Sequence, residues 1–271
     1  MKYLQNLHTH TIRCDGRDTP EEMILVAIEN GYFSLGFSGH SYMHYSNGRF
    51  LSLEGTEEYK KEIRALAEKY KSEIDVFLGL EFDMFSEIDL SGYDYLIGSV
   101  HYFKLGENYV GFDISQDGVK NVIDTHFGGD GMKYATTYYE HLSRLPEYGN
   151  FDIIGHFDLI TKHSDKVKFF DEDSKEYKNA AISAAEALKD KIPFFEVNTG
   201  AIARGYRKTP YPAPFIIKEL KRLGFGAVIS SDCHNKNFLD HRFDDVAELL
   251  KECGFKERYV LTKNGFEAVS L

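Results

Sequence analysis

Short apolar runs alternate with longer amphipathic segments along nearly the whole chain. The apolar runs lack a clear period of two, which is typical of parallel strands covered by helices rather than of strands that face water on one side. The pattern predicts strands at residues 3–10, 33–40, 74–80, 93–100, 151–156, 193–197 and 226–231, and a short last strand at 259–261. Strands that alternate with helices in this way indicate an α/β fold with a parallel sheet.

The segments between the strands predict helices, and the first helix has the clearest start. Thr19 can act as the N-cap, Pro20 suits the first helical position, and Glu22 stands three residues after the cap, which together form a capping box. Further helices are expected at 56–71, 132–145, 174–189, 214–223 and 244–253. Residues 102–131 are rich in Gly, Asp and Asn and predict a long loop with room for a short helix. Such a loop is uncommon in a compact domain unless it has a function.

The alternation continues without a linker or a break in composition, so a single domain over residues 1–271 is expected. The net charge of −11 argues against nucleic acid as a partner, because duplex binding needs clustered Lys and Arg. This charge also disfavours an anionic substrate unless metal ions supply positive charge.

The three cysteines form neither a disulfide framework nor a Cys-x-x-Cys pair, which indicates a reducing compartment. The first residues lack the apolar core of a signal peptide, and no apolar run is long enough to cross a membrane. We therefore expect a cytoplasmic protein with no membrane partner.

Side chains that can bind a metal or move a proton stand at the ends of all seven longer predicted strands. They are His8 with His10, His40, Glu81, His101, His156, Glu196, and Asp232 with His234. The C-terminal ends of the strands of a parallel β/α barrel converge on one face, whereas on an open sheet they would spread along an edge. The pattern therefore favours a barrel with one shared site.

These residue types indicate a metal site. His8 and His10 project to the same side of an extended backbone, although a short His-x-His match is weak evidence by itself. Imidazole and carboxylate ligands together suit Zn, Mn or Fe. The candidate ligands exceed the needs of one ion, so two or three divalent ions are expected, with Glu81 or Asp232 as a bridge. The candidates are His8, His10, Asp15, His40, Glu81, His101, His156, Asp232 and His234.

Several short motifs carry a resemblance to a known family. They include His8-Thr9-His10, Ser38-Gly39-His40, Gly79-Leu80-Glu81, Gly98-Ser99-Val100-His101, Gly155-His156-Phe157-Asp158 and Ser231-Asp232-Cys233-His234, together with Asp15. In this order the chain resembles the PHP (polymerase and histidinol phosphatase) superfamily. Glu196-Val197-Asn198-Thr199-Gly200 followed by Tyr211-Pro212 is similar to a segment of its histidinol-phosphate phosphatases. The resemblance implies a distorted (β/α)7 TIM-like barrel with the metal site at the C-terminal ends of the strands.

The resemblance also implies ligand sets and a reaction. One ion would take His8, His10, Glu81 and Asp232, a second would share Glu81 and add His101 and His156, and a third would take Asp15, His40 and His234. The reaction would be the metal-dependent hydrolysis of L-histidinol phosphate, a small phosphomonoester, in histidine biosynthesis. Two ions about 3.5–4 Å apart can clamp an ester oxygen and acidify a water molecule.

Further residues are candidates for contacts with the substrate. Arg204 and Arg207 could grip phosphate, and Glu196 could either bind the amine and imidazole or orient a metal ligand. Asp232 or His234 could protonate the leaving alkoxide, as could a water bound to a metal.

Three other functions remain open from the sequence. One is a PHP-type phosphoesterase that acts on nucleotide or sugar phosphates, and another is a non-catalytic metal-binding protein. The third is an amidohydrolase-like enzyme that cleaves C–N bonds. Many such enzymes carry a carboxylated Lys after a central strand, where this chain has Glu81.

Overall fold

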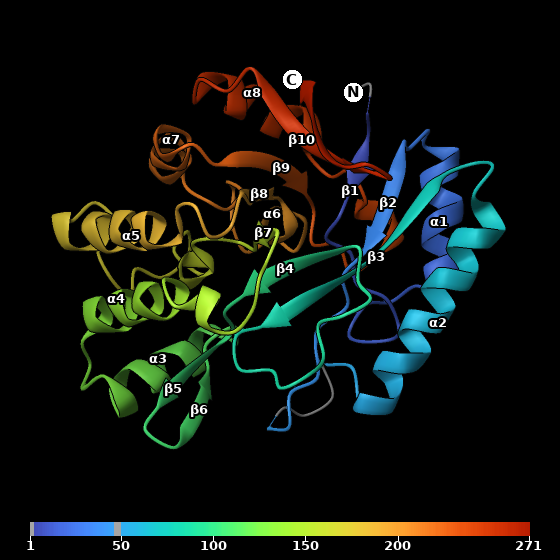
Figure 1. The fold of residues 1–271 in the computed structure, drawn as a ribbon. Coiled ribbons are helices and arrows are strands. Elements are labelled where there is room, and N and C mark those ends of the chain that lie inside the picture. Colours follow the sequence, from blue (N-terminus) through green and yellow to red (C-terminus); the bar gives the residue numbers. More distant parts are fainter. Residues whose placement is uncertain (1–2, 46–49) are drawn as a thin grey trace.

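A barrel of seven parallel strands forms the centre of the molecule (Figure 1). The structure is a computed structural model that describes residues 3–45 and 50–271. The strands follow the order β1 (Gln5–Asn6), β2 (Ser34–Phe37), β3 (Asp75–Asp83), β4 (Tyr95–Ser99), β7 (Ile153–Ile154), β8 (Phe194–Asn198) and β9 (Gly226–Ser230). The first and last strands meet beyond their regular ends, where the backbone N–H of His10 donates to the carbonyl of Cys233 at 2.9 Å. The predicted distorted barrel is therefore confirmed.

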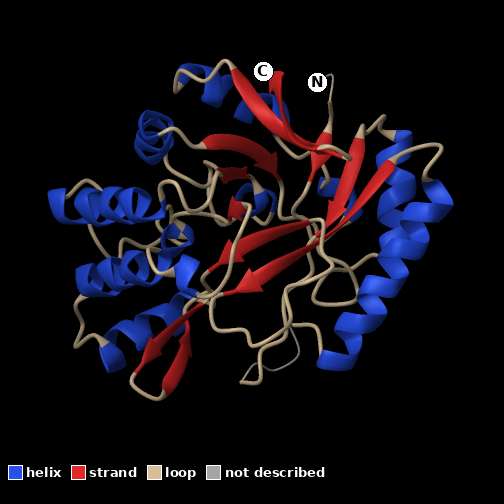
Figure 2. Ribbon diagram, viewed as in Figure 1, coloured by secondary structure: helices blue, strands red, loops and turns tan. Residues whose placement is uncertain are grey.

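Helices surround the barrel on its outer side (Figure 2). The helices are α1 (Pro20–Glu29), α2 (Leu53–Tyr70), α3 (Gln116–His126), α4 (Gly131–Leu142), α5 (Lys175–Leu188), α6 (Gly200–Ala203), α7 (Pro214–Leu223) and α8 (Phe243–Glu252), with short 3₁₀ turns at Leu145–Glu147, Leu159–Thr161 and Lys236–Phe238. The predicted capping box of α1 is present, because Thr19 accepts the N–H of Glu22 and the Glu22 carboxylate accepts the N–H of Thr19. Helix α2 begins three residues earlier than predicted, since Ser52 caps it by accepting the N–H of Gly55.

Apolar side chains fill the interior of the barrel away from the strand ends that carry the histidines. This cluster consists of Leu7, Phe77, Tyr95, Ile97, Ile153, Val228 and Leu261. The phenol of Tyr95 donates to the carbonyl of Leu7. A Cβ atom on Gly36 or Gly79 would lie only 2.4 or 2.1 Å from Tyr95 atoms, so glycine at both positions makes room for this ring.

A C-terminal hairpin is attached at the start of β1. It consists of β10 (Glu257–Thr262) and β11 (Gly265–Ser270), and the second of these strands was not predicted. The side chain of Gln5 bonds both backbone groups of Leu261, at 2.8 and 2.9 Å. The hairpin thus lies at the opposite end of β1 from His8 and His10.

The prediction for residues 102–131 was wrong in the long loop, although the short helix that it allowed is present as α3. The segment forms the hairpin of β5 (Tyr102–Leu105) and β6 (Asn108–Gly111), followed by α3, and Figure 1 shows it beside α4. The fully buried ring of Phe103 anchors the segment through edge contacts with Phe127 and Tyr134, both at 5.4 Å between ring centroids. These rings are far apart in the sequence, so local periodicity does not reveal them.

The alternation of strand and helix is interrupted once. Residues 84–94 connect β3 to β4 through turns, without a helix. Within the described residues, no helix is both long and apolar enough to span a bilayer.

Candidate metal centre

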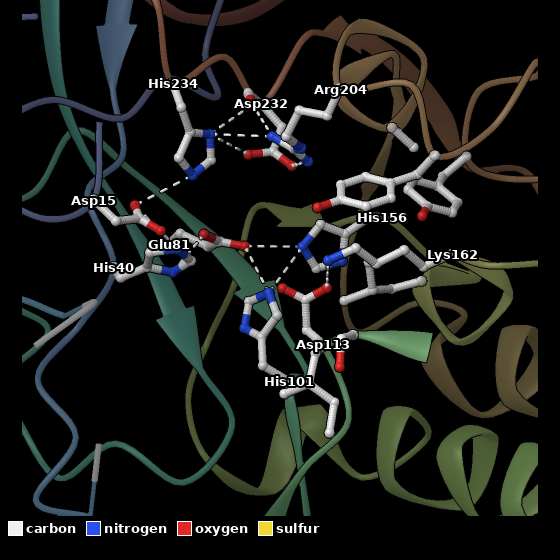
Figure 3. A pocket seen from close by; sticks show the side chains of 16 residues that line it. Asp15, His40, Glu81, His101, Asp113, His156, Lys162, Arg204, Asp232 and His234 are labelled. Carbon is white, nitrogen blue, oxygen red and sulfur yellow. Dashed lines mark hydrogen bonds and ion pairs between the residues drawn. The ribbon is translucent and has the colours of Figure 1, made fainter. Parts of the chain in front are cut away.

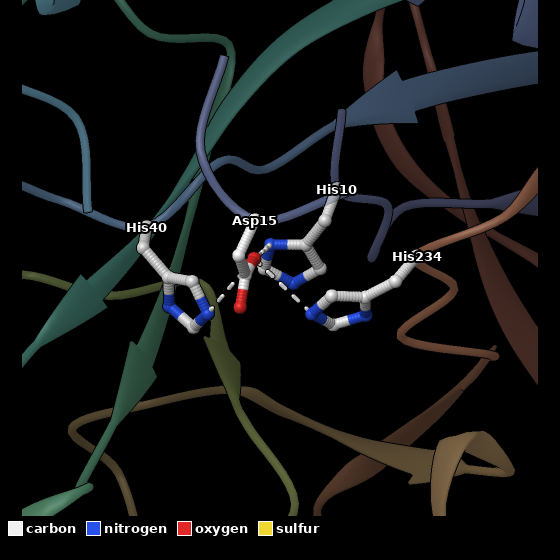
Figure 4. Close-up of side chains that lie close together, drawn as sticks. All are labelled: His10, Asp15, His40 and His234. Atoms are coloured by element: carbon white, nitrogen blue, oxygen red, sulfur yellow. Dashed lines mark ion pairs between the residues drawn. The ribbon is translucent and has the colours of Figure 1, made fainter. Parts of the chain in front are cut away.

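All nine predicted ligands gather at the C-terminal mouth of the barrel, where eight of them form three overlapping groups that could hold metal ions and His156 lies beside the third group. The first group surrounds Asp15 (Figure 4). Its Oδ1 atom lies 3.2 Å from Nε2 of His234, 3.6 Å from Nδ1 of His10 and 3.7 Å from Nε2 of His40. One carboxylate oxygen therefore faces three imidazoles that come from three different strand ends.

The second group joins side chains that follow the first strand, β1, and the last strand of the barrel, β9. It contains His8, His10 and Asp232. The Nε2 atoms of His8 and His10 lie 3.7 and 3.2 Å from Oδ1 of Asp232, and 3.3 and 3.4 Å from Oε2 of Glu81. The closure of the barrel between β1 and β9 is what brings Asp232 to this histidine pair.

The third group contains His40, Glu81 and His101, with His156 beside it. Oε1 of Glu81 lies 3.0 Å from Nε2 of His156 and 3.5 Å from Nε2 of His101, while Oε2 lies 2.8 Å from Nδ1 of His40 (Figure 3). The two oxygens of Glu81 thus face different histidines, which is the arrangement of a carboxylate that bridges two ions.

Buried atoms without hydrogen bonds show that this donor set fits metal ions. Nε2 of His8, Nε2 of His10 and Oε2 of Glu81 are buried and accept or donate no hydrogen bond within the part of the chain that the structure describes. Both imidazole nitrogens lie within 3.4 Å of the Glu81 oxygen. Two ligand atoms that share a zinc ion at about 2.1 Å are separated by about 3–3.5 Å, so one cation could satisfy all three atoms.

The protonation states also suit cation binding. Burial would raise the pKa of Glu81, but the neighbouring imidazoles of His40, His8 and His101 hold that pKa well below its ordinary value. Burial likewise opposes ionisation of Asp232, yet Arg204 and His8 keep its pKa well below normal. The carboxylates therefore carry negative charge, which is the state that binds a metal.

The two histidines of the first strand differ in their electrostatic surroundings. Burial, together with the nearby His234 and His40, lowers the pKa of His10 to about 3. Burial acts in the same direction on His8, but the Glu196 and Glu81 carboxylates raise its pKa well above the ordinary value. Cations that replace protons among these carboxylates would leave both imidazoles neutral, as metal ligation requires.

Two buried carboxylates orient histidine rings by contacting Nδ1, the ring nitrogen that does not face the cluster. Oε2 of Glu196 lies 2.8 Å from Nδ1 of His8, and Oδ2 of Asp83 lies 2.8 Å from Nδ1 of His101. Each contact fixes the ring so that Nε2 points into the cluster. Sequence reasoning missed Asp83, although its spacing of two from Glu81 on one strand was a usable signal.

Of the three residues predicted to contact the substrate, Arg204, Glu196 and Arg207, only Arg204 lines the cavity. Arg204 lines the cavity in front of the cluster, and its guanidinium donates to Oδ2 and to the carbonyl of Asp232, both at 2.8 Å. Glu196 is 1% exposed and does not line this cavity, since its oxygens accept from His8, Ser230 and the N–H of His156. The position of Glu196 therefore matches the orienting role rather than contact with a substrate.

Arg207 is not brought to the cavity either. Its guanidinium donates to the hydroxyls of Thr161 and Thr209 and lies 3.8 Å from Oδ2 of Asp158. It also packs over the ring of Tyr211, 5.0 Å from the centroid. These contacts place Arg207 in a buried ion pair behind the site.

The cavity has a volume of about 440 Å³, within the usual range of small-molecule sites. Its wall includes Tyr211, which stands in one of the motifs, and residues that the sequence did not single out: Asp113, Ile114, Ser115, Leu159, Lys162 and Tyr206. Nζ of Lys162 lies 2.6 Å from Oδ1 of Asp113 (Figure 3). For Asp113, Ile114 and Ser115 the length and polarity of segment 102–131 were the available signal, but they indicated no particular side chain.

Known proteins share this fold and sequence pattern. The PHP domain family matches residues 6–200. A probable histidinol-phosphatase of Deinococcus radiodurans is 29% identical over 270 residues, which cover 94% of this chain and 95% of the relative. A probable histidinol-phosphatase of Schizosaccharomyces pombe is 26% identical over 268 residues, which cover 90% of this chain and 84% of the relative.

A solved structure has the same fold. It is the crystal structure of histidinol phosphate phosphatase from Lactococcus lactis in complex with zinc, L-histidinol and phosphate. It matches with a TM-score of 0.71 at 22% identity, over 97% of this chain and 98% of the other. The fold and the clustered ligands define a metal-binding phosphoesterase. The chain belongs to the PHP domain family, so the resemblance seen in its motifs is confirmed, and the relatives it is similar to are histidinol-phosphatases.

Replacement of Glu81 should reduce the metal content of the protein. Glu81→Gln keeps the size of the side chain but removes the charge that faces the second and third groups, so we expect the loss of at least one ion per chain. Elemental analysis of the purified protein measures this. Glu87→Gln, an exposed position six residues further on, is the matched control and should retain the full metal content. Equal metal content in the two variants would contradict a bridging role.

Replacement of Glu196 should act through His8. Glu196→Gln weakens the contact that holds the His8 ring, so metal affinity should fall by about 10- to 100-fold, as expected for a residue that orients a ligand. Titration of the chelator-stripped protein with Zn measures the affinity. A variant that binds Zn normally but has a raised KM would instead support direct contact between Glu196 and a substrate.

Proposed function

We propose that the protein hydrolyses L-histidinol phosphate to L-histidinol and phosphate, with residues 1–271 acting as one PHP-type domain. The observation that carries this proposal is the set of nine side chains able to ligate metal at one mouth of the barrel, eight of them in candidate metal groups, beside a cavity that Arg204 lines. The histidinol-phosphatase relatives, and the zinc, L-histidinol and phosphate held by the Lactococcus lactis enzyme, support this choice of substrate.

Two or three divalent ions, Zn, Mn or Fe, would be held by the three groups. When bound, such ions neutralise phosphoryl oxygens and lower the pKa of a water molecule. The described side chains contribute binding and orientation. Arg204 presents a half-buried guanidinium to the cavity and can pair with a phosphoryl oxygen while it keeps Asp232 in place. Glu196 and Asp83 keep the rings of His8 and His101 aimed at the cluster.

The proton for the leaving alkoxide is better assigned to His234 than to Asp232. The pKa of Asp232 is held well below its ordinary value, so this carboxyl is ionised at neutral pH and has no proton to give. His234 lines the cavity, and its Nε2 atom faces Asp15 at 3.2 Å. Nε2 of His234 cannot bind an ion and carry a proton at once. His234 can therefore act as the acid only if the group around Asp15 holds no ion and the other two groups hold the metal.

Phosphate release tests the proposed activity. The metal-loaded protein should release phosphate from L-histidinol phosphate, chelation should abolish the release, and Zn or Mn should restore it. A panel of nucleotide and sugar phosphates serves as the comparison. Full activity in a verified metal-free sample would contradict the metal-dependent mechanism. Release from the nucleotide or sugar phosphates alone would favour that second class of substrate.

Arg204→Ala should raise the KM for the phosphoester. Loss of a charged hydrogen bond to phosphate corresponds to about 10- to 100-fold. Steady-state kinetics at saturating metal measure the effect, and the metal content must be checked because Arg204 also holds Asp232. The exposed Arg222, which pairs with Glu219, provides the control Arg222→Ala, for which no change is expected. An unchanged KM in Arg204→Ala would remove this residue from the phosphate site.

A further inference from the structure

We propose that the hydroxyl of Tyr211 donates a hydrogen bond to a phosphoryl oxygen of the substrate, an inference that rests on the phosphatase function proposed above. Tyr211 lines the cavity in front of the metal groups, and it is only 1% exposed. Its hydroxyl oxygen is buried and has no hydrogen-bond partner among the residues that the structure describes. Burial of an unsatisfied hydroxyl costs free energy, so few native structures keep one without a use for it. The hydroxyl is therefore available to a molecule that binds in the cavity.

The backbone fixes Tyr211 against the end of β8. The N–H of Tyr211 donates to the carbonyl of Asn198 at 2.9 Å, and the N–H of Asn198 donates to the carbonyl of Tyr211 at 2.7 Å. Asn198 is the last residue of β8, the strand that also carries Glu196. Two residues after Tyr211, the N–H of Ala213 donates to Oδ2 of Asp158 at 2.9 Å. A donor that is anchored to the barrel in this way is preorganised, which lowers the entropic cost of recognition.

The ring of Tyr211 lies between a buried cation and a predicted metal ligand. The guanidinium of Arg207 lies 5.0 Å from the ring centroid, which gives this buried arginine a packing role beside the cavity. The ring of His156 lies 6.4 Å from the same centroid, at an interplanar angle of 74°. Nε2 of His156 in turn lies 3.0 Å from Oε1 of Glu81. The phenol is therefore a neighbour of the groups to which bound cations would draw a phosphate.

The chemistry of a phenol suits an anionic acceptor. A tyrosine hydroxyl has an ordinary pKa of about 10, so at neutral pH it keeps its proton and acts as a donor. The phosphoryl oxygens carry the negative charge of the ester, and a hydrogen bond to a charged group is stronger than one to the neutral alcohol oxygen. Arg204 lines the same cavity. A phosphate bound there can therefore accept from a charged donor and from a neutral one.

The competing explanation is that the hydroxyl is purely structural and is satisfied by a water molecule in the wall. The two explanations differ in what the removal of the hydroxyl changes. Loss of a structural hydrogen bond lowers the stability of the protein and leaves phosphate binding intact. Loss of a donor to phosphate weakens phosphate binding and leaves the stability of the ligand-free protein intact, because the hydroxyl bonds no described residue.

The experiment uses the full-length, metal-loaded protein. Tyr211→Phe keeps the ring and removes only the hydroxyl. It should lower kcat/KM for L-histidinol phosphate, and raise the inhibition constant of inorganic phosphate, by about 10- to 100-fold, the range for a hydrogen bond to a charged group. The metal content and the melting temperature of the ligand-free variant should equal or exceed those of the wild type.

Tyr139→Phe is the matched control. Tyr139 is also a fully buried tyrosine, but its hydroxyl donates to the hydroxyl of Tyr177 at 2.8 Å. The control should show the opposite result, with a melting temperature lower by about 2–4 °C and unchanged kinetic constants.

Inorganic phosphate has no alcohol portion, so its inhibition constant reports on the phosphoryl oxygens alone. An unchanged inhibition constant in Tyr211→Phe would overturn the proposal, even if kcat/KM fell, because the hydroxyl would then contact another part of the substrate. A loss of metal or a lower melting temperature in this variant would also overturn it, in favour of the structural role. If the wild-type protein did not hydrolyse L-histidinol phosphate, the proposed function would fall together with the role of Tyr211. If the wild type hydrolysed it, a failure of the Tyr211 prediction would leave the proposed function intact.

Discussion

The buried carboxylate of Glu81 is the constraint on which the rest of the site depends. Glu81 is 1% exposed, and its two oxygens face imidazoles from several strand ends. An ionised carboxylate removed from water costs several kcal/mol unless positive charge compensates it. The surrounding histidines supply only part of this charge, since burial holds the pKa of His10 far below neutrality. Divalent cations in the candidate groups would complete the compensation, which couples the stability of this end of the barrel to metal binding.

The barrel separates this polar end from an apolar one. Tyr95 and its neighbours fill the interior, and the C-terminal hairpin is attached near Gln5, at the other end of β1. Glycines at positions 36 and 79 leave the space that the Tyr95 ring occupies. A packed interior gives the strand ends rigid starting points, so the ligands at the mouth are held by the whole sheet rather than by flexible loops. The apolar packing that stabilises the barrel and the side chains that can bind metal thus lie at opposite ends of the same barrel.

The fold could be predicted largely because its signals are local. Short apolar runs marked the strands, and Thr19 and Glu22 marked the start of α1 through contacts that span only three residues. The hairpin of β5 and β6 escaped prediction because its stabilising contacts, such as Phe103 with Tyr134, join residues about thirty positions apart in the sequence. No helix was predicted between the third and fourth strands, and the structure agrees, since turns alone connect them at residues 84–94.

The sequence by itself determined which side chains stand at the strand ends, and the parallel direction of the strands then required those side chains to meet on one face. It did not determine which oxygen of Glu81 faces which histidine, or that Glu196 orients His8 instead of lining the cavity. Nor did it reveal Asp113, whose place in the wall depends on how an entire inserted segment packs. Strand ends follow from a short periodic pattern, whereas contacts between distant segments follow from the packing of all side chains between them. Only the tertiary structure could decide the second kind.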